Sequence, residues 1–530
     1  MAALRALILS GTIARGRERA GVEAWAAWRA TPARQREEAG RFLSTLGNAA
    51  AEALGHWLLL QDRAAALAAW FGAEELAAMA QGPDAIARIE EALDRDIAAL
   101  DAMISRQLDA VLHARPLRRL EGSWRGLSWL VDQLPQDRAV KVRLLTISWR
   151  EICRDLERAI EFDQSALFRK VYEDEFGTPG GEPYGLLLVD HAVRHAPGPD
   201  SPTDDVAALL GLSQVAAAAF APLVAAAAPE LLGLDSYAEA GPAFDLADAL
   251  KLQDRMRFQG IKSREDTRFL GLLLPRVLGR AAWRDDGRRA DGFRYREYAP
   301  RHDARVWASP IYAFGAVAAR AFARYRWPAE VRGAEPQWEP TGGVVDTLPQ
   351  ERLPSDPPGP PPRPPVELAL TDEQERQLAD GNLIALVGLE MLPEATFGAL
   401  PSLHRPPRMT TEAASANQRL SSQLNNMLCV SRFAHCIKLM GRDMVGSYKT
   451  AEEVQFTLQR WLSKHVSGLA GGEQAAARSP LRDAKIEVRE RPGKPGSYGC
   501  VIQLQPHHQL DDIGAAFRLV TELTAPRAAA

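Results

Sequence analysis

The chain has 530 residues, of which 46% are hydrophobic, so it is long enough for two or three domains with sizeable cores. Its 64 basic and 68 acidic side chains leave a formal charge of -4, which argues against a nucleic-acid partner because no broad positive field is available for phosphates. The four cysteines form no Cys-x-x-Cys pair, which argues against a zinc ribbon or a disulfide framework and favours a reducing cytoplasm.

A helical region is predicted over residues 1–82, because this segment is rich in alanine. It contains four tryptophans: Trp25, Trp28, Trp57 and Trp70. Residues 11–20 are densely basic where a signal peptide would carry its cleavage site, so we expect no export signal.

The clearest helix is predicted over residues 86–112 and should end near Pro116. Apolar residues recur there at steps of three and four: Ile86, Ile89, Leu93, Ile97, Leu100, Ile104, Leu108 and Leu112. Farther on, Val140, Val142 and Leu144 alternate with basic residues, as in a half-buried strand. The short apolar runs 186–189 and 270–274 predict strands that are covered on both faces.

Residues 206–229 carry no charged side chain and are long enough to span a bilayer. The segment is mainly alanine, however, and lacks the dense leucine, isoleucine and phenylalanine content that favours membrane insertion. We therefore expect a buried or interface helix and not an integral membrane protein.

A proline-rich stretch at 349–365 cannot sustain a helix or a paired strand. We predict a linker over 349–368 that separates a domain at 83–348 from a C-terminal domain at 369–530. An adaptor-binding polyproline ligand is the alternative reading of this composition.

The C-terminal part mixes both kinds of secondary structure. A strand is predicted over 382–389, a long helix over 411–445, a hairpin from 484–489 and 497–505, and a last helix over 511–523. The helix at 411–445 has an apolar stripe with near-heptad spacing, so it should pack along another helix. The fold class is therefore α+β.

The sequence offers no convincing catalytic, cofactor or metal site. The glycines at 180–185 lack a Gly-Lys-Ser/Thr sequence and dinucleotide spacing, which favours a tight turn. Cys436 adjoins His435, but adjacent helix residues do not face each other. His507 and His508 have no acidic partner at ligand spacing, and the carboxylate pairs Glu265-Asp266 and Asp511-Asp512 show no environment that would separate their pKa values.

Trp124 and Leu127 lie one helical step apart, so we expect both to be buried, because large aromatic side chains usually are. Arg125 lies on the same helix and could anchor a carboxylate.

Several short motifs carry a resemblance. They occur in the order Ser123-Trp124-Arg125-Gly126-Leu127, Gly180-Gly181-Glu182-Pro183-Tyr184-Gly185 and Ser431-Arg432-Phe433-Ala434-His435, with further pieces at 229–236, 263–271, 322–327, 480–484, 495–498 and 505–510. Together they resemble the large subunit of the type VI secretion contractile sheath from about residue 83 to residue 523. The resemblance implies a tail-sheath-like core of mixed helix and sheet, with structural roles for Trp124, Arg125, Gly126, Gly180, Gly181, Glu182, Pro183, Arg432 and His435.

The resemblance also implies partners. They are a small sheath subunit, an inner tube of stacked hexamers, a baseplate, and an AAA+ unfoldase that recycles contracted sheath. An amino-terminal helix would be recognised by the unfoldase, with an apolar side made of Leu4, Leu7, Ile8 and Ile13.

A second interface is expected on the helix at 411–445. There Leu420, Leu424, Met427, Phe433 and Ile437 would face the small subunit or the tube. Two alternatives stay open. One is the sheath of a phage-tail-like contractile particle, which would lack the unfoldase helix, and the other is a soluble hydrolase that uses residues such as Cys436, His435 or Glu265.

Overall fold

The computed structural model describes residue 57 and residues 60–523, with gaps at 136–138, 179, 200, 289–291, 334–339, 354, 360–362, 390–391, 408–409, 412–414, 416–417, 419–420, 445–449, 468–477, 491–497 and 508–516. For residues 517–523 it describes the backbone. The chain divides into two compact units: a helical unit of Met1–Arg118 with Ala282–Ala304, and a main unit of Arg119–Ala281 with Arg305–Ala530. No helix in the described ranges combines the length and the apolar character that crossing a bilayer requires.

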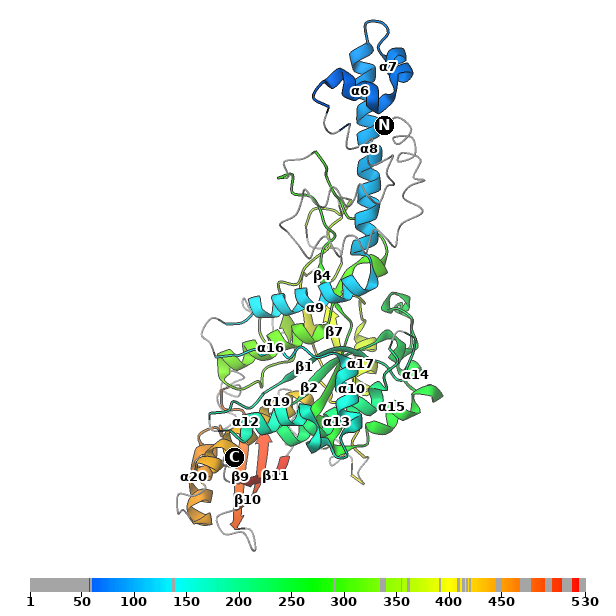
Figure 1. Ribbon diagram of the computed structural model, residues 1–530. Helices are drawn as coiled ribbons and strands as arrows, with labels where there is room; N and C mark the ends of the chain where they lie inside the picture. The colour runs from blue at the N-terminus through cyan, green and yellow to red at the C-terminus, as the bar shows by residue number, and fades with distance from the viewer. Residues whose placement is uncertain are drawn as a thin grey trace. The chain divides into compact units, whose positions relative to one another are not determined.

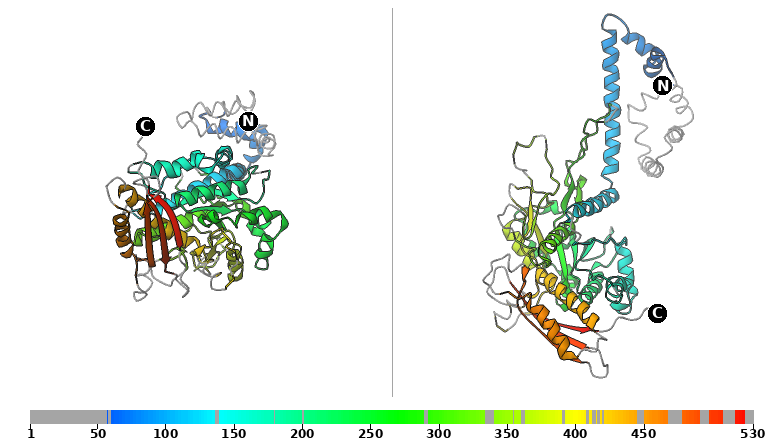
Figure 2. Two further views of the ribbon diagram at one scale, coloured as in Figure 1. Left: turned by 90° about the horizontal axis from the view of Figure 1, so that it is seen from below. Right: turned by 90° about the vertical axis from the view of Figure 1, so that its left-hand side faces the viewer.

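The helical unit is built on α8 (Ala85–Leu112), which matches the helix predicted from its apolar repeat (Figures 1 and 2). It is preceded by α6 (Arg63–Phe71) and α7 (Ala73–Met79). The Trp70 indole donates a hydrogen bond of 2.9 Å to Asp96 of α8, which holds these helices together.

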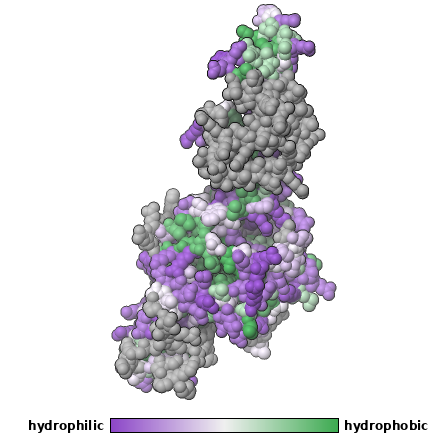
Figure 3. All heavy atoms as spheres, in the orientation of Figure 1, coloured by the Kyte–Doolittle hydropathy of each residue, from purple (hydrophilic) through white to green (hydrophobic). Residues whose placement is uncertain are grey.

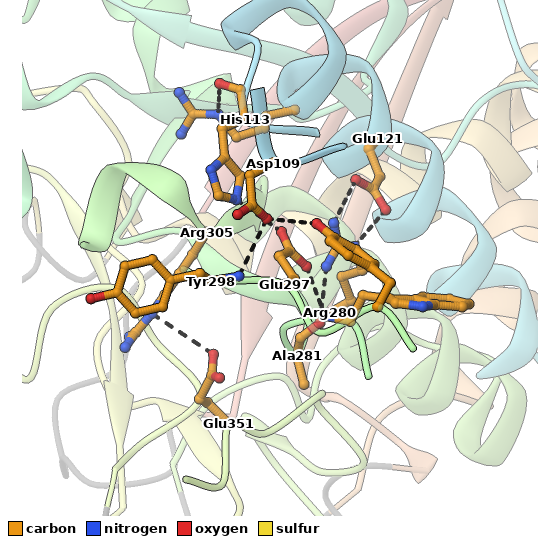
Figure 4. Close-up of polar contacts among 12 residues, drawn as sticks. Asp109, His113, Glu121, Arg280, Ala281, Glu297, Tyr298, Arg305 and Glu351 are labelled. Atoms are coloured by element: carbon orange, nitrogen blue, oxygen red, sulfur yellow. Dashed lines mark hydrogen bonds and ion pairs between the residues drawn. The ribbon is translucent and has the colours of Figure 1, made fainter. Parts of the chain in front are cut away.

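The far end of α8 binds the excursion 282–304 through polar side chains (Figure 4). Asp109 accepts a hydrogen bond of 2.6 Å from the Tyr295 hydroxyl, and His113 lies 3.1 Å from the Glu297 carboxylate. The helix ends at Leu112, and Pro116 lies in the first turn of the next helix, where its missing N–H leaves no bond unmade.

The main unit mixes helices and strands, which confirms the α+β class. Its helices are α9 (Arg115–Asp132), α10 (Trp149–Arg158), α11 (Ala166–Phe168), α12 (Asp174–Phe176), α13 (Asp205–Ala219), α14 (Leu246–Leu250), α15 (Met256–Ile261), α16 (Pro310–Tyr325), α17 (Asp372–Asp380), α19 (Leu424–Met444) and α20 (Ala451–Ser463). Its strands are β1 (Leu187–Val193), β2 (Leu223–Ala227), β3 (Leu270–Leu274), β4 (Val277–Arg280), β5 (Val306–Ala308), β6 (Val344–Val345), β7 (Ile384–Gly388), β8 (Ala395–Phe397), β9 (Leu481–Glu490), β10 (Tyr498–Pro506) and β11 (Phe517–Leu523).

The centre of the main unit is a six-stranded sheet in the order β1-β2-β3-β7-β8-β6. The first four strands are parallel, and β8 is antiparallel to both of its neighbours. Every residue of β2 and β3 is buried, as expected for parallel strands covered on both faces. The predicted strands at 186–189, 270–274 and 382–389 correspond to β1, β3 and β7.

Helices cover both faces of this sheet. Leu130 of α9 and Phe314 of α16 pack in one apolar cluster with Val224 and Leu273, whereas α13 and α19 contribute to a second cluster (Figure 1). The charge-free segment 206–229 forms α13 and then β2, both buried in the protein. It is therefore not one continuous helix.

The packing of α9 on the main unit uses glycine and not tryptophan. A Cβ atom at Gly122 would lie 2.2 Å from the Trp307 carbonyl oxygen, and one at Gly126 would lie 2.3 Å from the Tyr312 ring. Trp124 points away from this contact and is 57% exposed, so the prediction that it is buried is wrong. Close backbone approach selects the glycine face of the helix, and the large side chain lies on the outer face.

The proline-rich segment does not separate two units. β3 and β7 lie on either side of it in the sequence and pair within one sheet. The Leu278 N–H donates to Pro365 O at 2.9 Å, and Glu367 both donates its N–H to Arg276 O and pairs with the Arg276 guanidinium. The described part of 349–368 is therefore attached to the main unit by backbone bonds that proline does not prevent.

The C-terminal sheet has the order β11-β10-β9, and all its pairs are antiparallel. β9 and β10 form the predicted hairpin. The helix predicted over 511–523 is wrong, because residues 517–523 form β11 on the free side of β10; strand pairing overrides a local pattern that fits a helix. The predicted helix at 411–445 contains the continuous helix α19 at 424–444.

Candidate assembly surface

The most enzyme-like cluster in the described main unit surrounds Asp205. His191 lies 2.9 Å from this carboxylate, the Trp149 indole donates to it at 2.7 Å, and the Arg194 N–H donates at 3.0 Å. Burial acts to raise the pKa of Asp205. The hydrogen bonds from His191, the Arg194 N–H and Trp149 favour the carboxylate more strongly, so the pKa lies below its ordinary value. The carboxylate therefore acts as a buried anchor that joins α10, β1 and α13.

The nearby Cys153 does not supply a nucleophile to this cluster. Burial, followed by the charge of Asp205, raises the pKa of the Cys153 thiol to about 11. A thiol at that pKa stays protonated at neutral pH, whereas nucleophilic cysteines need a lowered pKa and access to substrate. The cluster is a structural support.

The pair Cys436 and His435 is also unsuited to catalysis. The His435 imidazole is fully buried, with Nε2 lying 3.0 Å from Ala219 O, which makes it a hydrogen-bond donor to that carbonyl. Burial lowers the pKa of His435 to about 4 and raises the pKa of Cys436. The histidine therefore fastens α19 to the end of α13.

This buried histidine makes stability depend on pH. Its ordinary pKa is 6.5, so as pH falls the unfolded chain binds a proton before the folded chain does. The contribution of His435 is complete above about pH 6.5 and declines toward pH 4, by about 3 kcal/mol. Urea unfolding at pH 7.5 and 4.5 should show a larger loss in the wild type than in His435→Gln, and an equal loss in both proteins would contradict this role.

Two other candidate residues, His507 and Glu265, each contact one neighbouring side chain. His507 Nε2 lies 3.1 Å from the Ser467 hydroxyl, and Glu265 pairs with Arg268 at 2.6 Å. His508, Asp511 and Asp512 lie outside the described residues. Within the described ranges, no three histidine, cysteine or acidic side chains gather as a metal would require.

A cavity of about 530 Å³ lies between α9, α16 and residues 340–346. Its charged lining consists of Arg320, Arg324 and Asp346, and it contains no nucleophilic side chain. The Arg320 guanidinium is held by the carbonyl oxygens of Gly342 and Val344, at 3.0 and 2.7 Å. This cavity shows no acid–base pair of the kind a hydrolase would use.

The unusual feature of the main unit is the exposed segment 139–148. Its residues 140–144 were predicted as a half-buried strand, but no described strand pairs with the segment, and residues 141–148 are all exposed. Four of its apolar side chains are between 39% and 59% exposed: Val142, Leu144, Leu145 and Ile147. The alternating pattern therefore lies in a segment that pairs with no strand among the described residues.

The glycine-rich motif holds this segment in place. Lys141 pairs with Glu182, and Arg143 pairs with both Glu182 and Glu175. A Cβ atom at Gly181 would lie 2.1 Å from Glu175 O, so glycine allows the motif to fold back onto the Glu175 region. The motif is thus a support for residues 139–148, a role that its sequence did not reveal.

The main unit has two further features that a partner chain could use. β1 is the edge strand of the six-stranded sheet, and no described strand pairs with its outer side. The outer face of α9 carries Leu120, Trp124 and Val131, all well exposed, at steps of seven or fewer residues. Figure 3 shows apolar residues gathered on the face that carries α9. We call residues 139–148 and this α9 face the assembly surface.

The other motif residues have structural contacts. Arg125 donates to Glu121 on the preceding helical turn at 2.7 Å, and Glu121 also accepts from Arg280 at 2.6 Å. The Arg432 guanidinium lies 5.4 Å from the centre of the Phe322 ring. Gly180 takes a positive φ of 82°, as a turn glycine does.

The stripe predicted as an interface on α19 lies in the interior. Leu424, Met427, Phe433 and Ile437 are at most 1% exposed, and Leu420 lies outside the described residues. The Phe433 ring stacks on Trp327 with centres 4.1 Å apart. These side chains offer no surface to a second chain in this conformation, so burial favours a core role. Leu4, Leu7, Ile8 and Ile13 also lie outside the described residues.

Comparison with known proteins places the chain among sheath proteins. Residues 94–404 match the tail sheath N-terminal domain of the VipB (EvpB) family, and residues 413–523 match its tail sheath gpW/gp25-like domain. The chain is 33% identical over 452 residues to the type VI secretion system sheath protein TssC1 of Pseudomonas aeruginosa. That alignment covers 84% of this chain and 88% of the relative.

Proposed function

This chain belongs to the VipB tail sheath family and is a large subunit of the type VI secretion sheath, and we propose that its assembly surface is where the small sheath subunit binds. The observation that carries the proposal is the segment 139–148, with which no described strand pairs and in which residues 141–148 are exposed and include apolar side chains.

A strand added by the partner would stabilise this segment in two ways. Backbone pairing contributes about 0.5–1.5 kcal/mol for each hydrogen bond formed, net of water. Burying an apolar side chain of the size of leucine or valine contributes about 1.5–3 kcal/mol more. An exposed strand-like segment is also an aggregation hazard for a lone chain, which favours a permanent partner.

The ion pairs prepare the segment for that partner. Because Glu182 and Glu175 pair with Lys141 and Arg143, the charges of these two cations of the segment are balanced by acidic residues of the same chain. These ion pairs would restrict the segment before the partner arrives, and such restriction lowers the entropy lost on binding. Binding would then bury mainly apolar side chains.

The proposed role is structural and not catalytic. Heterodimers would stack around an inner tube and contract by rigid-body movement between subunits, with a baseplate at one end and the assembly in the cytoplasm. Buried thiols with raised pKa values and a carboxylate anchored by its donors support this view over a hydrolase.

Recycling by an AAA+ unfoldase is the part of the proposal that separates a secretion sheath from a phage-tail-like particle. Leu4, Leu7, Ile8 and Ile13 would form the recognised side of an amino-terminal helix. Deletion of residues 1–20 should block disassembly of contracted sheath by the unfoldase. Unchanged disassembly would favour the particle.

Co-expression of the chain with its small sheath subunit, followed by negative-stain electron microscopy, tests the function as a whole. We expect hollow tubes. A monodisperse particle that never polymerises with the partner present would reject the sheath role.

A further inference from the structure

The cavity between α9, α16 and residues 340–346 contains a cation without a carboxylate partner. Arg320 of α16 lines the cavity and donates from Nη2 to the carbonyl oxygens of Gly342 and Val344, at 3.0 and 2.7 Å. Among the described residues these two carbonyls are its bonding partners, and neither is an acid. The Nε and Nη1 atoms of the guanidinium therefore keep donors for a further ligand.

The surroundings of Arg320 make an incoming anion favourable. Burial lowers the pKa of Arg320, and the charges of Asp346 and Glu330 act in the opposite direction without restoring the ordinary pKa. The side chain nevertheless stays protonated at neutral pH, as arginine does in proteins. A cation that is partly withdrawn from water gains most from a carboxylate, which can accept two of its N–H groups at once.

Most of the remaining lining is apolar. Val317 of α16 and Val344 and Val345 of β6 are buried side chains of the lining, and Trp129 of α9 adds an indole ring. The volume of about 530 Å³ lies within the range of roughly 300–1,000 Å³ that is usual for ligand sites. The lining therefore suits a carboxylate that is accompanied by aliphatic carbon, as in an acidic side chain beside an apolar one.

One wall of the cavity is held in an unusual backbone conformation. Thr347 follows the lining residue Asp346 and has a positive φ of 58°, which a β-branched residue rarely adopts. The Trp129 indole donates to the Thr347 carbonyl oxygen at 3.2 Å. Such strain persists where neighbouring contacts impose it, and it is concentrated at ligand sites and switch regions. The wall is therefore shaped before a ligand arrives.

The cavity lies close in sequence to the segment that is proposed to bind the small subunit. Pro135 belongs to the lining and is followed, after a short connection, by residues 139–148. We propose that the cavity is a pocket for an acidic side chain of the small sheath subunit, whose carboxylate binds Arg320 while its apolar neighbours contact Trp129 and Val317. The identity of the occupant rests on the proposed sheath function, whereas the preference for a carboxylate does not.

Two substitutions in the full chain test the pocket, with Kd measured by titration of the purified subunits. Arg320→Met removes the guanidinium but keeps an unbranched side chain, and Kd should rise on the order of 30-fold or more. Ala323→Trp fills the cavity and leaves Arg320 with its two carbonyls, and it should weaken binding to a similar extent. Ala87→Trp, on the exposed side of α8, is the matched control and should bind as the wild type does.

The carboxylate is identified by a double-mutant cycle. Each Asp and Glu of the small subunit is replaced in turn by Asn or Gln, and each variant is titrated against the wild-type chain and against Arg320→Met. One position should weaken binding to the wild type and have little further effect on Arg320→Met, because the interaction is already lost there. Equal losses in both backgrounds at every acidic position would overturn the proposal.

The remaining outcomes are also decisive. Normal binding by Ala323→Trp would overturn the pocket, and this variant decides the question if Arg320→Met does not fold. If an acidic residue of this same chain were the occupant, both substitutions would lower the stability of the chain alone and leave Kd unchanged, which would also overturn the proposal. Absence of binding by the wild type would instead reject the sheath function.

Discussion

Leu144→Asp is expected to abolish co-purification with the small sheath subunit while leaving the chain folded. Leu144 is 59% exposed, so the substitution should change the free energy of unfolding by no more than about 0.5 kcal/mol. On strand addition the new carboxylate would be buried against apolar side chains without a partner. A cost of about 3 kcal/mol corresponds to an increase of roughly 100-fold or more in Kd, measured by titration of the purified subunits.

Met256→Asp is the matched control. Met256 is 68% exposed on α15 and lies outside the assembly surface, so its variant should bind the small subunit as the wild type does. Normal binding by Leu144→Asp would remove residues 139–148 from the interface. Loss of binding by both variants would show that any added charge interferes.

The second large effect is expected at Phe433, in the interior of the main unit. Its ring stacks on Trp327 and meets Trp461 edge-on with centres 5.9 Å apart. Phe433→Ala removes these contacts and leaves a cavity, which typically costs about 3–5 kcal/mol. Denaturant unfolding should show this loss, whereas Phe456→Ala on the exposed face of α20 should change stability by about 0.5 kcal/mol or less.

This comparison separates the two roles considered for the α19 stripe. A core residue lowers the free energy of unfolding of the chain alone, whereas an interface residue lowers binding with stability unchanged. Unaltered stability in Phe433→Ala together with lost binding would return the stripe to the interface.

The local sequence pattern was sufficient to locate those helices and strands whose own residues define the buried face. The apolar repeat located α8, and the short apolar runs located β1 and β3. Alternation and turn residues located the β9–β10 hairpin. Each of these elements buries a face that its own residue pattern defines.

Prediction from the sequence failed where the structure of a segment depends on residues far away in the chain. The alternation at 140–144 describes a strand, but it cannot show whether a partner strand exists in the same chain. The exposed position of Trp124 follows from the close approach of Gly122 and Gly126 to another helix and strand, which no local rule contains. Residues 517–523 became a strand because β10 offers a free edge there.

The motifs indicated the protein family but not which surface of the chain binds a partner. Gly181 and Glu182 were interpreted as parts of a turn, and the structure shows that the same motif region pairs with Arg143 and Lys141 of the exposed segment 139–148. The signal that could have found this surface was the alternation of basic and apolar residues at 140–144, together with the acidic residues Glu175 and Glu182 farther along the chain.

Hydrogen exchange of residues 139–148 in the chain alone and in its complex with the small sheath subunit tests the central claim most directly. We expect fast exchange in the chain alone, because no described strand pairs with the segment, and strong protection across the segment in the complex. Equal and fast exchange in both states would show that the small subunit binds elsewhere.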